Sequence, residues 1–543
     1  VFSEAVASFS SSADISDPNG TLTTMTSSDN ITWVGTFTPD NNIADMTNTL
    51  TLGTNYTDTA GNAGPAKTTE NYKIDTQVPT VSGIVISSAI GIQNSFLNEG
   101  DNISVTATFS ENVLVTGTPQ LTMVVGSDNR TATYTSGDNS TTLVFTFAIQ
   151  AGETDVDGIS IGANALALNS GTISDALGNT AILTHSAVPA NTGYKVDTTV
   201  PTLSSVGITS GTNMLNNFLN AGDVLSVTST FSENVLVTGT PRLTLVVGSD
   251  NRTAPFTSGD NSTSLVFTYA IQAGDNDTDG ISFEANVLAL NGGTIGDPAG
   301  NTATLTHSSV SDNASYKVDT TAPTVTTFSI SDTELLSGDN ATVTLVFSEV
   351  VASFSSSADI SDPNGTLTTM TSSDNITWVG TFTPDNNIAD MTNTLTLGTN
   401  YTDTAGNAGP AKTTENYKID TQVPTVSGIV ISSAIGIQNS FLNEGDNISV
   451  TATFSENVLV TGTPQLTMVV GSDNRTATYT SGDNSTTLVF TFAIQAGEAD
   501  SDGISIGANA LALNSGTISD AAGNIANRTH NAVSANTSYK VVT

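Results

Sequence analysis

The stretch "NISVTATFS" at 102–110 alternates apolar residues with serine and threonine. Two further segments show the same alternation, "TTLVFTFAIQ" at 141–150 and "NTLTLGTNYTD" at 48–58. A period of two is typical of β-strands that bury one face. Turn-forming sequences such as "DPNG" at 17–20 and "GSDN" at 126–129 lie between such segments. The pattern therefore predicts short antiparallel strands joined by hairpin turns.

A helical period does not persist anywhere in the chain for more than a turn or two. The best candidate is "ANALALN" at 163–169, which is ambiguous between helix and strand. The sequence therefore predicts an almost entirely β protein.

A proline-containing motif divides the chain into repeats. The stretch "VDTTAPTV" at 318–325 returns in near-copies at 74–81, 196–203 and 419–426, and successive motif prolines are 122, 122 and 101 residues apart. These spacings are typical of single domains, so a long and a short kind of unit alternate. Residues 1–26 return at 346–371 with one change, which makes the larger repeat 345 residues long.

Each unit has room for about seven short strands, which predicts an antiparallel β-sandwich. The fold class is therefore all-β, as a tandem array of sandwiches in an elongated chain. The expected domains are a partial short unit at 1–76, long units at 77–198 and 199–320, a complete short unit at 321–421, and a third long unit at 422–543.

The first and last units depart from the pattern of the others. The opening unit begins at Val1, equivalent to Val346, and so lacks residues that form most of two strands in the complete copy. Either preceding sequence completes this sandwich, or another chain donates the strand. Near the other end, Val542 stands where the other long units have Asp197 and Asp319. This predicts an incomplete site and a last junction that behaves differently.

Composition excludes several classes of protein. The 51 acidic and 12 basic residues give a net charge of −39, which argues against nucleic acid or an anionic membrane as partner. No apolar run is long enough to span a bilayer. The chain has no cysteine, so disulfides and thiolate metal sites are absent. Such an acidic surface suits high salt or a supply of cations.

The long unit, with "VTATFSENVLVTGTPQLTMVVG" and "YKVDTTVPT", resembles the Ig-like repeats of giant bacterial and archaeal surface proteins. The short unit, with "VTLVFSE", "YTDTAGN" and "YKIDTQVPT", is similar to the related Ig-like repeats of large adhesins and biofilm proteins. The resemblance covers essentially the whole chain. It implies an Ig-like fold, an extracellular location, a role as a spacer or as a surface-layer or filament subunit, and Ca²⁺ at the junctions.

Carboxylates recur in three loop settings that suit Ca²⁺, which takes six to eight oxygen ligands. They are the Glu that ends the "FSE" strand, the Asp of a "D-x-x-G-N" turn with its Asn, and the Asp of the linker motif. The residues are Glu4, Glu111, Glu233, Glu349 and Glu456; Asp58, Asp175, Asp297, Asp403 and Asp520, with Asn179, Asn301, Asn407 and Asn524; and Asp75, Asp197, Asp319 and Asp420.

These settings should meet at one end of each sandwich, because loops gather at the two ends of an Ig-like fold. Three converging carboxylates repel one another without a cation, and a bound Ca²⁺ resolves the repulsion. The alternative is that they are solvated turn residues, since Asp and Asn are favoured in turns.

Two further acidic settings are weaker candidates. An early "GD" turn, expected to face the preceding domain, places Asp101, Asp223, Asp339 and Asp446. An acidic loop of the long units begins like an EF-hand but lacks the later bidentate Glu. It holds Glu153, Asp155 and Asp157; Asp275, Asp277 and Asp279; and Glu498, Asp500 and Asp502. Each is either a Ca²⁺ site or a solvated turn.

Catalysis is not expected. His185, His307 and His530 occupy one equivalent place in the long units, each without a nearby second His or a Cys. Trp33 and Trp378 are copies of one strand position and are expected to pack in the core. Paired carboxylates could serve a glycosidase, but no aromatic-lined cleft is indicated.

The sequence thus predicts a structural, Ca²⁺-stiffened repeat region, acting as an adhesin stalk or as an assembling surface-layer or filament subunit. Its partners would be flanking repeats, neighbouring copies, surface glycans or other surface proteins. The alternative, from another class, is a carbohydrate-binding or accessory module array of a secreted hydrolase.

Overall fold

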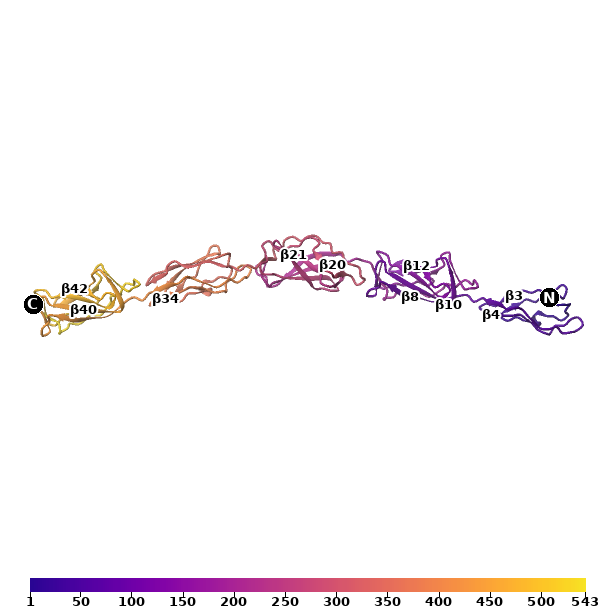
Figure 1. The fold of residues 1–543 in the computed structure, drawn as a ribbon, viewed down its shortest axis with the longest axis horizontal. Helices are drawn as coiled ribbons and strands as arrows, with labels where there is room; N and C mark the ends of the chain where they lie inside the picture. Colours follow the sequence, from indigo (N-terminus) through magenta and orange to yellow (C-terminus); the bar gives the residue numbers. More distant parts are fainter.

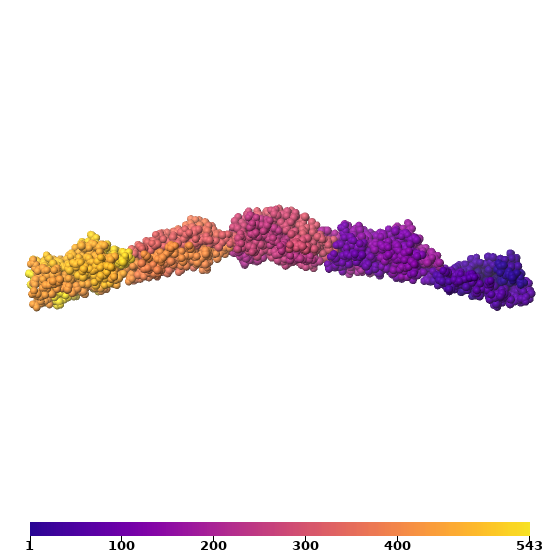
Figure 2. Space-filling view, viewed as in Figure 1, coloured from indigo at the N-terminus to yellow at the C-terminus, as the bar shows by residue number.

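The computed structural model describes all 543 residues as an elongated row of five β-rich units (Figure 1). The space-filling view shows the row narrowing between consecutive units and bowing gently along its length (Figure 2). Every sheet takes its strands from a single unit. We call the units the opening unit (1–76), the first long unit (77–198), the second long unit (199–320), the complete short unit (321–421) and the third long unit (422–543).

The three long units share one topology, and the strands of the first long unit represent it. A seven-stranded sheet has the order β8, β10, β13, β12, β11, β15, with β16 paired to the far part of β10, and a three-stranded sheet has the order β14, β17, β9. The strands are β8 (Val81–Ile90), β9 (Phe96–Leu97), β10 (Asn102–Thr116), β11 (Gln120–Val125), β12 (Asp128–Ser136), β13 (Ser140–Ala148), β14 (Thr154–Asp155), β15 (Leu166–Ala167), β16 (Thr172–Ser174) and β17 (Lys195–Asp197).

The other two long units repeat these strands. In the second they are β18 (Leu203–Gly211), β19 (Phe218–Leu219), β20 (Val224–Thr238), β21 (Arg242–Val247), β22 (Asp250–Ser258), β23 (Ser262–Ala270), β24 (Asn276–Asp277), β25 (Leu288–Ala289), β26 (Thr294–Gly296) and β27 (Lys317–Asp319). In the third they are β38 (Val426–Ile435), β39 (Phe441–Leu442), β40 (Asn447–Thr461), β41 (Gln465–Val470), β42 (Asp473–Ser481), β43 (Ser485–Ala493), β44 (Ala499–Asp500), β45 (Leu511–Ala512), β46 (Thr517–Ser519) and β47 (Lys540–Val542).

The complete short unit has three smaller sheets, in the orders β28, β30, β33, β32; β29, β37, β34; and β31, β35, β36. Its elements are β28 (Val325–Ile330), β29 (Glu334–Leu336), β30 (Ala341–Phe347), α2 (Ser356–Asp359), β31 (Ile360–Ser361), β32 (Gly365–Leu367), β33 (Thr377–Pro384), β34 (Ala389–Asn393), β35 (Thr396–Leu397), β36 (Lys412–Thr413) and β37 (Tyr417–Asp420).

The opening unit has no counterpart of β28, β29 or β30. Its elements are α1 (Ser11–Asp14), β1 (Ile15–Ser16), β2 (Gly20–Leu22), β3 (Phe37–Pro39), β4 (Ala44–Asn48), β5 (Thr51–Leu52), β6 (Lys67–Thr68) and β7 (Tyr72–Asp75). A cavity of about 640 Å³, lined by Phe2, Phe9, Trp33 and Tyr56 among others, lies where those strands would pack.

The alternating pattern of "NISVTATFS" has the predicted consequence. Ile103, Val105 and Ala107 are fully buried, and Leu143 of β13 joins them in a core that also includes Leu97 of the second sheet. Burial of the apolar face against another sheet is the main stabilising contribution in such a sandwich. "ANALALN" contains the short strand β15 and no helix. Trp378 packs against the short unit's core, as expected.

Candidate metal centre at the junctions

The linker Asp closes the last strand of one unit and holds the start of the connection to the next. Asp319 ends β27, and its Oδ1 accepts a hydrogen bond of 2.9 Å from the Thr321 N–H. Asp75, Asp197 and Asp420 accept the equivalent bond two residues on. This local turn leaves the second carboxylate oxygen free to face the following unit.

The Glu of the "FSE" motif lies inside a strand in the long units. The prediction that it ends the strand is wrong there: β10 continues to Thr116, and the pairing with β13 shifts register between Thr108 and Val113. This irregularity surrounds Glu111. In the complete short unit the prediction holds, since β30 ends at Phe347 and Glu349 follows it.

One oxygen of this Glu is buried without a hydrogen-bond partner in the three long units. The atoms are Oε1 of Glu111, Glu233 and Glu456. Burial, and then the charges of Asp75 and Asp175, raise the pKa of Glu111 above its ordinary value. Glu233, Glu349 and Glu456 have their pKa raised by burial and by the corresponding two Asp residues. A buried carboxylate oxygen without a partner is costly unless a ligand satisfies it.

The "D-x-x-G-N" turn holds its Asp by hydrogen bonds. Oδ1 of Asp403 accepts from the N–H groups of Ala405, Gly406 and Asn407, and Oδ2 accepts from the side chain of Asn407 at 2.9 Å. For the equivalent Asp175, burial alone would raise the pKa, but the hydrogen bonds from Asn179 and the turn outweigh it and the pKa is lowered. The turn therefore keeps a charged carboxylate in place.

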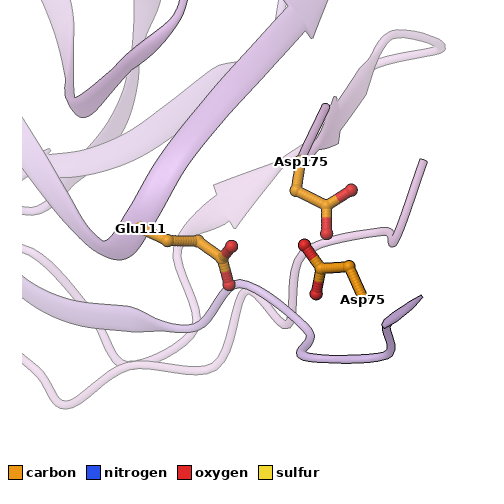
Figure 3. Close-up of side chains that lie close together, drawn as sticks. All are labelled: Asp75, Glu111 and Asp175. Atoms are coloured by element: carbon orange, nitrogen blue, oxygen red, sulfur yellow. The ribbon is translucent and has the colours of Figure 1, made fainter. Parts of the chain in front are cut away.

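The structure brings these three settings together across the junctions. In three of them, one carboxylate oxygen from each residue lies within 4.8 Å of the others. The groups are Asp75, Glu111 and Asp175; Asp197, Glu233 and Asp297; and Asp319, Glu349 and Asp403. Figure 3 shows the first group, with all three carboxylates directed toward a common point. In each group the linker Asp comes from one unit and the other two residues from the next.

The fourth junction has the same residues in a wider arrangement. Asp520 and Asp420 lie close enough to Glu456 for their charges to raise its pKa, yet the three do not form a group as tight as the others. The opening unit provides Glu4 and Asp58. Asp58 is held by Asn62 as in the other turns, and Glu4 is exposed.

This donor set fits a hard divalent cation. It consists of oxygen ligands, as Ca²⁺ requires, and in the groups of Glu111 and Glu233 it includes a buried oxygen with no other partner. Without a cation the three charges repel one another: burial is the first cause of the raised pKa of each Glu, and the charges of the two Asp residues raise it further. Several buried acidic clusters of the chain can therefore bind a metal ion.

The Asn of the turn connects consecutive units directly. Nδ2 of Asn301 donates to the main-chain oxygen of Asp197 in the preceding unit at 2.8 Å and to Oδ2 of its own Asp297. Asn179, Asn407 and Asn524 make the same pair of bonds at their junctions. Both amide protons are thus used, so only Oδ1 is left as a metal ligand, and in Asn524 it accepts from the Ser337 N–H.

The "GD" turns lie at the other end of their units from the one expected. Asp101 accepts a hydrogen bond of 2.9 Å from the Asn98 N–H, and Asn98 contacts the following unit. The prediction that these turns face the preceding domain is therefore wrong. Asp223, Asp339 and Asp446 accept the equivalent backbone hydrogen bond in their units. None of the four Asp residues belongs to a three-carboxylate group.

The acidic loops of the long units are held by contacts within the unit. Asp277 is buried and accepts from the N–H groups of Gly248 at 2.8 Å and Gly280 at 2.6 Å. Asp275 pairs with Arg252 at 2.7 Å and accepts from the Tyr269 hydroxyl at 2.5 Å. Burial and this hydrogen bond raise the pKa of Tyr269 to about 12.

The other two long units repeat the Arg pair and the backbone bonds, with Phe147 and Phe492 in place of Tyr269. Glu153 pairs with Arg130 and Glu498 with Arg475, while Asp155 and Asp500 each hold two backbone N–H groups. The last acidic residues of the loops, Asp157, Asp279 and Asp502, are exposed. None of these residues joins a three-carboxylate group.

Sequence reasoning missed two sets of residues. It did not assign partners to Arg130, Arg252 and Arg475, although each stands at one place in the copies of "GSDNR". It also missed Asn94, Asn98, Asn216 and Asn220, which contact the following unit. The repeated "NSFLN" and "NNFLN" were a visible signal, but which unit they touch depends on how consecutive units are oriented.

The raised pKa of each junction Glu predicts a pH dependence. Without a cation, a group with a raised pKa favours the folded joint when protonated, and this contribution is lost as the pH rises above about 4.3, the ordinary value for Glu. Cation binding needs the junction Glu in its charged form. The Ca²⁺ affinity should therefore increase as the pH rises above that value. Calorimetric Ca²⁺ titrations of the full chain between about pH 4.5 and 7 check this. A pH-independent affinity would contradict it.

Comparisons with known proteins bear on the short units. Residues 1–74 and 319–419 match a family model described as a bacterial Ig-like domain. No curated protein matches the chain. The matched residues belong to the opening unit and the complete short unit, and the long units, each with a seven-stranded and a three-stranded sheet, are also sandwich-like. The fold is therefore a nearly all-β tandem array of Ig-like domains.

The match has consequences for function at a coarse level. Domains of this family are typically non-catalytic, and they are typically extracellular or exposed at the cell surface. A structural repeat region is the role that this suggests. In addition, no helix in the structure has the length and apolar character needed to cross a membrane.

Proposed function

We propose that the chain is a Ca²⁺-stiffened spacer of an extracellular cell-surface protein, either as an adhesin stalk or as a surface-layer or filament subunit. The observation that carries the proposal is the group of three carboxylates at three of the four junctions, with one residue from one unit and two from the next. A spacer needs defined angles between its domains, and these ligands lie where the angle is set.

The stiffening follows from how the ligands are distributed. At the junction of Asp319 with Glu349 and Asp403, bending the chain moves Asp319 away from the other two. A cation bound to all three opposes that movement, because bending would break a coordination bond. When bound, the cation supplies charge neutralisation. The protein positions the ligands through the turn of Asp403 and the linker bond from Thr321.

The hydrogen bond from the turn Asn to the linker carbonyl supports the same role. It is present at all four junctions and requires no cation. At three of these junctions the carboxylates also converge. There the units are already placed for binding, and this pre-organisation lowers the cost of ordering the joint.

Small-angle scattering and thermal unfolding of the full chain test the proposal, with Ca²⁺ and with a chelator. We expect a larger maximum dimension and a higher melting temperature with Ca²⁺, since a ligand that binds only the folded joint stabilises it. Mg²⁺ serves as a control for ionic strength and charge. If neither quantity changes on chelation, the proposed stiffening is wrong.

The two structural roles differ in their assembly. A stalk should remain monomeric with Ca²⁺, whereas a surface-layer or filament subunit should associate through neighbouring copies. Sedimentation velocity over a range of protein concentrations, with and without Ca²⁺, separates them.

A further inference from the structure

The junctions between complete units are not equivalent. We call them the long-to-long joint, at Asp197; the long-to-short joint, at Asp319; and the short-to-long joint, at Asp420. All three have the bond from the turn Asn to the linker carbonyl. They differ in a second set of contacts, made by the loop that leads into β9, β19 or β29 of the preceding unit.

In the long units this loop provides two asparagines that bind the turn of the next unit. Across the long-to-long joint, Nδ2 of Asn94 donates to the Pro298 carbonyl at 2.9 Å, and Nδ2 of Asn98 donates to the Ala299 carbonyl at 3.0 Å. Across the long-to-short joint, Asn216 and Asn220 donate in the same way to Thr404 and Ala405. Each asparagine pair therefore donates hydrogen bonds to the carbonyls of both middle residues of a "D-x-x-G-N" turn.

The short unit has no such pair. Strand pairing sets the equivalence: Phe96 and Leu97 pair with Lys195 and Val196, and Glu334 and Leu335 pair with Lys418 and Ile419. Leu336 thus stands in the place of Asn98, and Asp332 in that of Asn94.

Neither replacement can donate a hydrogen bond to a carbonyl. The Leu336 side chain is apolar, and the Asp332 carboxylate accepts from the Glu334 N–H at 3.0 Å. The only hydrogen bond from this loop to the next unit is from the Ser337 N–H to Asn524.

A cavity lies at the short-to-long joint. It has a volume of about 330 Å³, and its lining includes Leu336, Met391, Ala521 and Ala522. Met391 is 59% exposed. The three carboxylates are also less tightly grouped here than at the other two joints. This joint has fewer contacts and more open space than the other two. Bending it therefore breaks fewer stabilising contacts and costs less free energy.

We propose that the short-to-long joint is the hinge of the array, and that the asparagine pairs make the long-to-long and long-to-short joints stiff. Residues 77–421 then move as one rod of three units, and the 345-residue repeat contains one hinge. This inference goes beyond the proposed function and does not depend on it, because the asparagine contacts contain no cation.

Spin labels measure the two joints separately, and the absence of native cysteine makes the labelling specific. The exposed residues Thr253, Thr381 and Thr476 are suitable sites, since Thr253 and Thr476 are equivalent positions in long units. Thr253→Cys with Thr381→Cys spans the long-to-short joint, and Thr381→Cys with Thr476→Cys spans the short-to-long joint. Pulsed dipolar spectroscopy of the full chain gives the two distance distributions.

We expect the distance distribution across the short-to-long joint to be at least about twofold wider than that across the long-to-short joint, because the former has fewer contacts. Equal widths, or a wider distribution at the long-to-short joint, would overturn the inference. The comparison uses label pairs alone, so it does not depend on how any loop variant folds.

Exchanging the loop residues tests the cause. Asp332→Asn with Leu336→Asn should narrow the short-to-long distribution, because both carbonyls of the next turn gain a donor. Asn216→Asp with Asn220→Leu is the matched control and should widen the long-to-short distribution. Widths that do not follow the exchange, in variants whose melting temperatures match the parent, would contradict the role of the asparagines.

Repeating the measurement in chelator separates this inference from the proposed function. The difference between the joints should persist without Ca²⁺. If chelation makes the two distance distributions equally wide, the difference comes from the cation, which overturns the proposed hinge and leaves Ca²⁺ stiffening in place. If the widths of both distributions are the same with and without Ca²⁺ but still differ from each other, Ca²⁺ stiffening is wrong and the hinge is supported.

Discussion

Asp319→Asn is expected to weaken Ca²⁺ binding at the long-to-short joint by at least about tenfold, because affinity depends on the number of charged ligands. The substitution retains Oδ1 as the acceptor for the Thr321 N–H, so the linker turn should persist. In chelator the same change should stabilise the joint. Burial, and the charge of Asp403, raise the pKa of Asp319, so removing its charge relieves both penalties.

This reversal of sign is what identifies a metal site. A carboxylate that serves only as a turn residue would give one small effect, the same with and without Ca²⁺. Calcium titration calorimetry and thermal unfolding, each with and without chelator, measure the two effects. Asp312→Asn is the matched control, since Asp312 is exposed and belongs to no carboxylate group. Unchanged affinity for Asp319→Asn would count against the site.

Asp277→Ala is expected to destabilise the second long unit by about 1 to 3 kcal/mol, because a buried N–H left without an acceptor costs about that much. Asp277 holds the N–H groups of Gly248 and Gly280, and Gly280 is buried. Burial also raises the pKa of Asp277, so removing its charge returns part of the cost. Urea unfolding of the full chain, monitored at this unit, measures the change.

The same experiment separates the two interpretations of the acidic loop. If Asp277 has only its structural role, the loss of stability is equal with Ca²⁺ and with chelator. If the loop is a second Ca²⁺ site, the loss is larger with Ca²⁺, and Asp279→Ala reproduces part of it because Asp279 is exposed and available to an ion. Asp277→Asn keeps one acceptor oxygen and should have an intermediate effect.

Much of the fold could be predicted from local pattern. Strand β10 was evident from its alternation, because a sandwich buries every second residue. The continuation of β10 past Glu111 was not, since it depends on a register shift against β13, which is a pairing between distant segments. The short strand β15 was equally hidden, because only its pairing with β11 makes Leu166 and Ala167 a strand.

The candidate site could be predicted in part for a similar reason. Repetition placed Asp, Glu and a turn Asp at matching offsets in every unit, so convergence at a junction was a natural expectation. Which acidic residues meet, and which are bound within a unit, depends on three-dimensional contacts. Asp277 and Asp319 look alike as loop aspartates, but the first caps backbone N–H groups while the second faces Glu349 and Asp403.

One sequence that occurs twice shows the division between local and tertiary control. "NITWVGTFTP" forms strand β33 over Thr377–Pro384 in the complete short unit, where β30 pairs with it. In the opening unit, which has no counterpart of β30, only Phe37–Pro39 is a strand. The sequence by itself determined the strand-forming pattern, the repeat length and the positions of the carboxylates. Tertiary structure decided which strands form in full and which carboxylates converge, because backbone pairing and charge clustering both need a partner from elsewhere in the chain.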